Sequence, residues 1–169
     1  MNAADLATLR ALCHQPVAAL ATLHDGEPAV SMVPFVLLPA ATAEGLRLVI
    51  HISQLAAHTR DLQVHPRMAL MITADPQQAD SVLALSRLSM TGVVTPCPPE
   101  HPDYTAARAA YLTKLPDSAE LFSFGDFALY LITPDQARYV AGFGRAMTLT
   151  PQQLAVTASF AAPPDTTVE

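Results

Sequence analysis

Residues 50–72 read IHISQLAAHTRDLQVHPRMALMI, and this stretch decides how we expect the chain to fold. Apolar and polar residues alternate over 46–53, which predicts a half-buried strand. Ser53 is a preferred N-cap residue, and the apolar residues after it recur at helical spacing, which predicts a helix over 54–64. A His-Pro pair ends that helix, and the apolar run over 67–73 predicts a second strand.

Outward from this unit, the sequence predicts further strands and two more helices. The Asp-Gly pair at 25–26 joins two apolar runs and is a strong hairpin signal. Gly92 interrupts a long apolar run, which indicates a β-bulge or bend. The other strands are predicted over 16–23, 28–38, 82–94 and 127–133, with an extension over 137–141 after a turn at 133–135, and the helices over 2–14 and 103–115.

These elements predict a mainly β fold with appended helices. About six strands with one crossover helix favour an antiparallel barrel over a doubly wound sheet. The length of 169 residues and mass of 18.0 kDa fit a single domain, which we place over 1–160. Residues 161–169 contain a Pro-Pro pair and lack apolar periodicity, so we expect a flexible C-terminal tail.

The composition indicates that much apolar surface must be covered. The chain is 51% hydrophobic and 14% charged, whereas an average soluble domain is about 25% charged. A monomer would have difficulty burying this much apolar surface, so we expect a second subunit to cover part of it. The 15 prolines are spread through the chain, which argues against a coiled coil or a helix bundle.

Charge and hydropathy exclude several classes of partner and suggest a location. The net charge is −6 and the basic residues never cluster, so we expect neither nucleic acid nor an anionic membrane surface as a partner. No apolar run reaches the roughly 18 residues of a membrane-spanning helix, and the N-terminus does not resemble a signal peptide. We therefore expect a cytoplasmic protein.

The sequence shows no motif for metal binding or nucleophilic catalysis. Cys13 and Cys97 stand alone, and the histidines do not pair at a metal-binding spacing, so we assign no metal site. A nucleophile elbow and a phosphate-binding P-loop are both missing, and the catalytic residues remain unknown.

Two features point to an anionic ligand. Ser53, His58 and Thr59 bring hydroxyl and imidazole groups to the positive end of the predicted helix, as in a phosphate site. A capped amphipathic helix with solvated polar residues explains the same pattern. Arg87 lies in an otherwise apolar strand and must reach solvent, a carboxylate or an anionic ligand. An arginine that extends to solvent from the outer barrel face explains it equally well.

Four segments together resemble a known family. They are SMVPFV (31–36), residues 50–72, LSRLSMTGVV (85–94) and ARYVAGFGRA (137–146). In this order they resemble the pyridoxamine 5′-phosphate oxidase-like FMN-binding split barrels, and most of all the branch that includes haem-utilisation proteins. The resemblance covers roughly residues 10–147 and implies a six-stranded antiparallel split β-barrel that forms a homodimer, with two flavin sites at the subunit interface.

The resemblance also implies roles for individual residues. Residues 31–34 would line the isoalloxazine ring, three residues near the predicted helix start would hold the FMN phosphate, and a strand arginine would add positive charge. Two residues of the partner subunit would approach the ring. The implied FMN-binding residues are Ser31, Met32, Val33, Pro34, Ser53, His58, Thr59, Arg87, Val140 and Phe143.

Departures from the family pattern shape the functional expectation. His58 stands where biosynthetic oxidases usually have Lys, and Ser31 stands where they usually have a phosphate-binding Arg, so the predicted phosphate site is less cationic. Haem-degrading relatives are thought to use a C-terminal His as iron ligand, but no His follows His101. We therefore expect an FMN-dependent oxidoreductase with an unknown small-molecule substrate or electron donor, ahead of two alternatives. These are a haem-binding or haem-degrading protein and a non-catalytic flavin-binding protein.

Overall fold

A computed structural model describes residues 1–38, 45–79, 81–142 and 144–158 of the chain. Phe143 and the predicted tail over 161–169 lie outside the described residues. The helices are α1 (Ala3–Cys13), α2 (Ala57–Val64), α3 (Tyr104–Lys114) and α4 (Pro151–Ala158), with 3-10 turns at Pro76–Gln78, Val82–Ala84 and Pro116–Ser123. The strands are β1 (Val17–His24), β2 (Glu27–Pro34), β3 (Val36–Leu38), β4 (Arg47–Ser53), β5 (Arg67–Thr73), β6 (Arg87–Pro96), β7 (Phe127–Gly142) and β8 (Arg145–Leu149).

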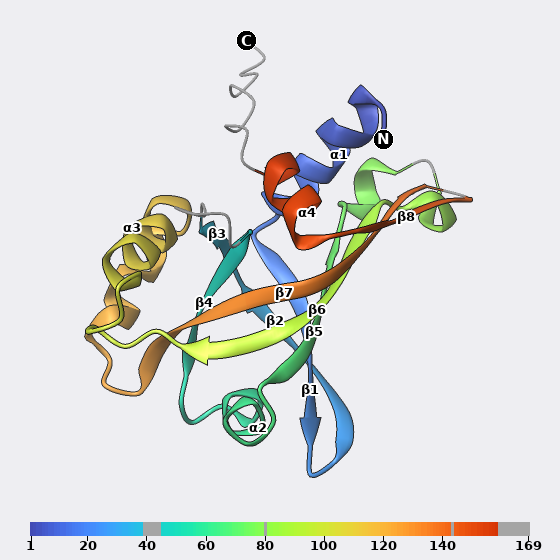
Figure 1. The fold of residues 1–169 in the computed structure, drawn as a ribbon. Helices are drawn as coiled ribbons and strands as arrows, with labels where there is room; N and C mark the ends of the chain where they lie inside the picture. Colours follow the sequence, from blue (N-terminus) through green and yellow to red (C-terminus); the bar gives the residue numbers. More distant parts are fainter. Residues whose placement is uncertain (39–44, 80, 143, 159–169) are drawn as a thin grey trace.

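The described strands form one curved antiparallel sheet (Figure 1). Its order is β2-β1-β5-β6-β7-β4-β3, with β8 added to β7. Phe35 alone separates β2, which pairs with β1, from β3, which pairs with β4. The two ends of the sheet are therefore joined by a single strand that changes partner at Phe35, and this is where the barrel is split. The predicted split-barrel class is confirmed.

The described residues form a sheet of 8 strands, whereas the sequence predicted six. The run predicted over 28–38 is divided into β2 and β3, and the strand β8 was not predicted. Strand β7 runs through 133–135 without the predicted turn, because these residues pair with β6 around a bulge. The strand predicted over 82–94 is wrong at its start. Ser81 Oγ accepts a hydrogen bond from the Leu83 amide and favours a 3-10 turn instead.

Two glycine positions are explained by local geometry. Asp25 and Gly26 form the two-residue turn between β1 and β2 with φ of 51° and 86°, the left-handed conformation that such hairpins require. At Gly92, a Cβ atom would lie 2.4 Å from the Thr133 carbonyl oxygen, so only glycine allows β6 and β7 to approach at their bulge. Both the hairpin and the bulge confirm the sequence prediction.

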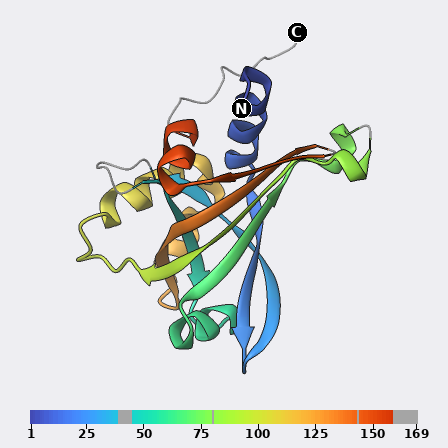
Figure 2. The ribbon, with the colours of Figure 1, turned by 45° about the vertical axis from the view of Figure 1, so that its right-hand side comes forward.

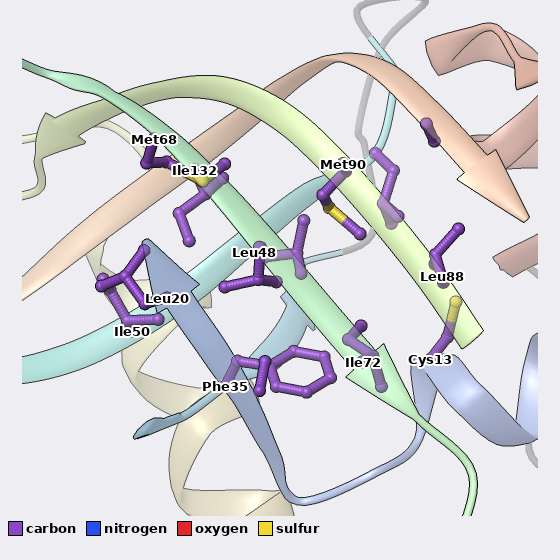
Figure 3. Close-up of a cluster of buried hydrophobic side chains, with 14 of the residues drawn as sticks. Cys13, Leu20, Phe35, Leu48, Ile50, Met68, Ile72, Leu88, Met90 and Ile132 are labelled. Atoms are coloured by element: carbon purple, nitrogen blue, oxygen red, sulfur yellow. The ribbon is translucent and has the colours of Figure 1, made fainter. Parts of the chain in front are cut away.

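Residues from all sides of the barrel fill its interior (Figure 3). Leu20, Phe35, Leu48, Ile72 and Leu88 are each fully buried there, and in the figure they point toward one another from β1, the split, β4, β5 and β6. Helix α1 closes one end of this core with buried leucines and Cys13. Helix α2 lies at the opposite end, beside the β1–β2 hairpin (Figure 1).

A second core cluster lies between the sheet and α3. Val49, Leu129 and Leu131 on the barrel's outside contact Ala107 and Tyr111 of α3. The prediction that β4 is buried on one face only is therefore wrong: its pattern is buried from Leu48 to Ile52, because α3 and the 3-10 turn over 116–123 cover the other face.

The outer face of β1, β2, β5 and β6 carries apolar side chains that the described residues leave exposed. Val30, Met32 and Met71 are 71%, 65% and 42% exposed. Ala19 pairs with both Met32 and Met71, so these three residues form one row across the strands. A cavity of about 200 Å³ on this face is lined by Ala21, Ala69 and their neighbours. We call this surface the β1–β6 face.

The hairpin of β7 and β8 and the turn at 82–84 project from the barrel on the side away from α3 (Figure 2). No helix among residues 1–38, 45–79, 81–142 and 144–158 is long and apolar enough to cross a membrane.

Candidate functional site

Ser53 is not the N-cap of α2. The helix begins at Ala57, and a turn separates it from β4 through a hydrogen bond from the Ala56 amide to the Ser53 carbonyl oxygen of 3.2 Å. Ser53 Oγ accepts from the Leu55 amide at 3.1 Å and donates to Asp126 Oδ2 at 2.6 Å. The hydroxyl therefore faces a carboxylate, which comes from the segment just before β7.

Thr59 is turned away from any ligand. Its Oγ1 donates to the Ser53 carbonyl oxygen at 2.7 Å, and the residue is completely buried. Because a hydroxyl has a single proton to donate, this contact leaves none for a phosphate oxygen. Thr59 holds the start of α2 against the end of β4.

The side chains of His58 and Ser31 lie in contact. His58 Nδ1 lies 3.2 Å from Ser31 Oγ, which joins α2 to β2. The other ring nitrogen, Nε2, is covered by protein and has no hydrogen-bond partner among the described residues. Burial lowers the pKa of His58, and the nearby Asp61 carboxylate only partly opposes this effect. The imidazole is therefore neutral near pH 7.

Helix α2 is fixed to β1 by a hydrogen-bonded trio of side chains. The buried Asp61 accepts from Thr22 Oγ1 at 3.0 Å, and His24 Nδ1 lies 2.8 Å from its second carboxylate oxygen. The hydrogen bond to Asp61 raises the pKa of His24, and the same bond lowers the pKa of Asp61. This charged contact secures the helix that carries His58.

The remaining predicted residues do not gather around Ser53 and His58 within one chain. Arg87 pairs with Thr73 at the far end of β5 and with Val140 of β7. Six residue steps of about 3.3 Å along β5 place it on the order of 20 Å from the α2 end. Its Nη1 donates to the Leu85 carbonyl oxygen at 3.2 Å.

The residues predicted to line the ring fall on two sides of β2. Met32 is exposed on the β1–β6 face, whereas Val33 is buried in the barrel. Ser31 faces α2, and Pro34 is partly exposed at the end of the strand. Only part of the predicted set can therefore contact one ligand from a single chain.

A carboxylate lies where the predicted flavin phosphate would contact Ser53. A phosphate dianion there would meet the Asp126 carboxylate beside Ser53 Oγ, and the imidazole of His58 is neutral. Arg60 Nη1 donates to the Leu55 carbonyl oxygen at 2.8 Å. Like charges at close range repel by several kcal/mol in a partly buried site, about 4 kcal/mol at 4 Å with an effective dielectric constant near 20.

Replacing Asp126 with Asn should improve FMN binding. The amide oxygen can still accept from Ser53 Oγ, while the negative charge is removed, so we expect the Kd for FMN to fall about tenfold or more. Fluorescence titration measures this Kd. Asp117→Asn, a matched charge removal at an exposed position of the 116–123 turn, should leave it unchanged. Equal FMN affinity in wild type and Asp126→Asn would refute the repulsion.

Three residues of this region were not predicted from the sequence: Asp126, Asp61 and His24. Asp126 is 73 positions from Ser53, and only the pairing of Ser53 with Phe127 between β4 and β7 brings it close. Asp61 and His24 are 37 positions apart. His24 precedes an Asp-Gly turn, Asp61 lies on a helix and Asp126 follows a glycine, so each looks like an ordinary surface polar residue and no sequence signal marks it.

The sequence was compared with models of known protein families. The model of pyridoxamine 5′-phosphate oxidase matches residues 6–141. The chain belongs to the pyridoxamine 5′-phosphate oxidase family. The family named from the sequence is therefore confirmed.

Similar members of the pyridoxamine 5′-phosphate oxidase family have names that refer to haem. The chain is 35% identical over 123 residues to the chloroplastic heme oxygenase HOZ of Arabidopsis thaliana, a match that covers 73% of this chain and 35% of that protein. It is 30% identical over 129 residues to the heme oxygenase HutZ of Vibrio cholerae, covering 75% and 70%. The chain thus spans about a third of the plant relative's length.

Solved structures of family members share the fold. A heme binding protein from Mycobacterium smegmatis matches with a TM-score of 0.75 and 30% identity, over 92% of this chain and 61% of that one. The structure of HutZ, the heme storage protein from Vibrio cholerae, matches with a TM-score of 0.63 and 26% identity, over 75% of this chain and 85% of that one. These members support the branch named from the sequence, the one that includes haem-utilisation proteins.

Proposed function

We propose that this protein binds haem at the α2 end of the barrel. The observation that carries the proposal is the ring of His58, a neutral imidazole whose Nε2 has no hydrogen-bond partner among the described residues. A neutral imidazole is a good iron ligand and a poor phosphate partner. The three family members named above all carry heme in their names, which supports the same ligand.

We further propose that the protein acts as a homodimer through the β1–β6 face. This face exposes three large apolar side chains, those of Val30, Met32 and Met71, in a chain with few charged residues. A second copy of the chain has the same apolar face and could cover them. We place the two-fold axis at the middle of this face, perpendicular to it. The end of β5 and β6 that carries Thr73 and Arg87 in one copy would then lie over the α2 end of the other copy. Arg87 of the second copy would then supply positive charge for the carboxylates of haem.

FMN-dependent oxidoreduction is the second candidate function. It is favoured by the family model and by the contact of Ser31 with His58, two positions that the resemblance assigned to the flavin site. The acidic α2 end speaks against it. Whether a bound cofactor is turned over, and with which electron donor, distinguishes an enzyme from a storage protein.

Separate titrations with haemin and with FMN test the proposal. We expect haemin to give a saturable Soret shift with one haem per chain, and FMN to bind at least about tenfold more weakly, because its phosphate meets Asp126. Tight FMN binding without specific haemin binding would overturn the proposal and favour the oxidoreductase. Adding NADH or NADPH to the loaded protein then tests for turnover.

A further inference from the structure

We infer that His58 is the haem iron ligand and that it binds through Nε2. The inference rests on the proposed haem function and names the residue that performs it.

The first support is the bonding of the His58 ring. Metal-bound histidines usually donate their other ring N–H to a protein oxygen, which fixes the tautomer and the ring orientation. With the proton on Nδ1, His58 donates to Ser31 Oγ at 3.2 Å and presents the Nε2 lone pair, which has no partner in the described part of the chain. A covered nitrogen without a partner is unfavourable in the free protein, and coordination to a metal would satisfy it. Because Nε2 is covered, the side chains over it must part when iron binds.

The second support is the position of the ring. His58 lies in the first turn of α2, and the contacts of Asp61 with Thr22 and His24 hold that helix to β1. A ligand on a fixed helix keeps its geometry better than one on a loop. Ser31 and Asp61 are therefore positioning residues for His58.

The third support is that the other histidines are less suitable. His24 is paired with Asp61, and this contact favours its protonated form, which cannot bind a metal. His51 is 5% exposed and stacks on Phe122 at 3.9 Å, behind the sheet and under α3. His101 Nδ1 accepts from the Asp103 amide at the start of α3. His14 and His65 lie just past the ends of α1 and α2, away from Ser31.

The test compares three variants loaded with haemin. His58→Ala should weaken haemin binding about tenfold or more and abolish the iron–imidazole stretching band in the resonance Raman spectrum of the ferrous complex. Added imidazole should restore the histidine-type absorption spectrum in His58→Ala. His65→Ala, the matched control at the end of the same helix, should behave like the wild type. Ser31→Ala should retain the band but shift its frequency.

The outcomes separate this inference from the proposed function. A wild type that gives no specific haem complex refutes the proposed function itself. A wild type that binds haem, with an iron–imidazole band that persists in His58→Ala or disappears in His65→Ala, refutes the assignment of His58 alone. Circular dichroism of the haem-free variants confirms that loss of binding is not loss of fold.

Discussion

Replacing Ala69 with Arg should convert the protein to a monomer of 18.0 kDa and strongly reduce its haem binding. Ala69 pairs with Ala21 on one side and Thr91 on the other, at the middle of the β1–β6 face. It lines two neighbouring cavities of about 200 Å³ each on that face. An arginine there would place an unpaired charge between two apolar sheets, which costs several kcal/mol in an interface of this kind.

Light scattering measures the mass of each variant. Ala109→Arg, the same change at an exposed position of α3, serves as control and should leave the dimer intact. A wild type that is itself monomeric, or an Ala69→Arg variant that remains dimeric, would contradict the proposed interface. If the Ala69→Arg variant remained dimeric, the two chains would have to meet through another surface of the barrel.

Replacing His51 with Phe should protect the protein against mild acid. His51 is buried between β4 and the 116–123 turn, where it stacks on Phe122 and contacts the edge of Tyr111. Nδ1 of His51 has no partner among the residues that the structure describes. Burial lowers the pKa of His51 to about 4, because the charged ring would lose its hydration without gaining a counterion.

The sign of the effect follows from proton uptake. Between its ordinary pKa of 6.5 and its folded pKa of about 4, His51 is protonated in the unfolded chain and neutral in the folded one. The unfolded state binds more protons, so stability is lost as the pH falls through this window. The loss near pH 4.5 is on the order of 2 kcal/mol relative to neutral pH, and phenylalanine removes it.

Urea unfolding at about pH 7 and about pH 4.5 measures this difference. The lowered carboxyl pKa values of Asp61, Asp103 and Asp135 also reduce stability at low pH, but they do so equally in both proteins. The difference between His51→Phe and the wild type therefore isolates the histidine. Identical losses of stability in the two proteins would show that His51 does not remain neutral in the folded state.

Much of the fold was predictable because local signals and global topology agree. Three local signals each specified one structure: the Asp-Gly pair its hairpin turn, Gly92 its bulge, and the apolar run over 67–73 the strand β5. The prediction failed where a distant element changes the environment. Strand β4 looks half-buried by sequence, but α3 covers its polar face, so His51 is in the core.

The candidate site was predictable only in part. The family resemblance named Ser31 and His58 as site residues but not the contact between them, and the Ser53 hydroxyl, expected to face a ligand, instead donates to Asp126. Arg87 was expected beside the same site, but sheet order places it at the opposite end within one chain. Such outcomes depend on strand register and on contacts between residues far apart in sequence, which periodicity and local motifs do not encode.

The most direct measurement of the central claim is a competition followed by gel filtration. The protein is mixed with equimolar haemin and FMN, unbound ligand is removed, and the absorption spectrum of the eluted protein is recorded. We expect a Soret band from a histidine-ligated haem, in a peak with the mass of two chains and without the two bands of flavin. A flavin spectrum without a Soret band would contradict the account.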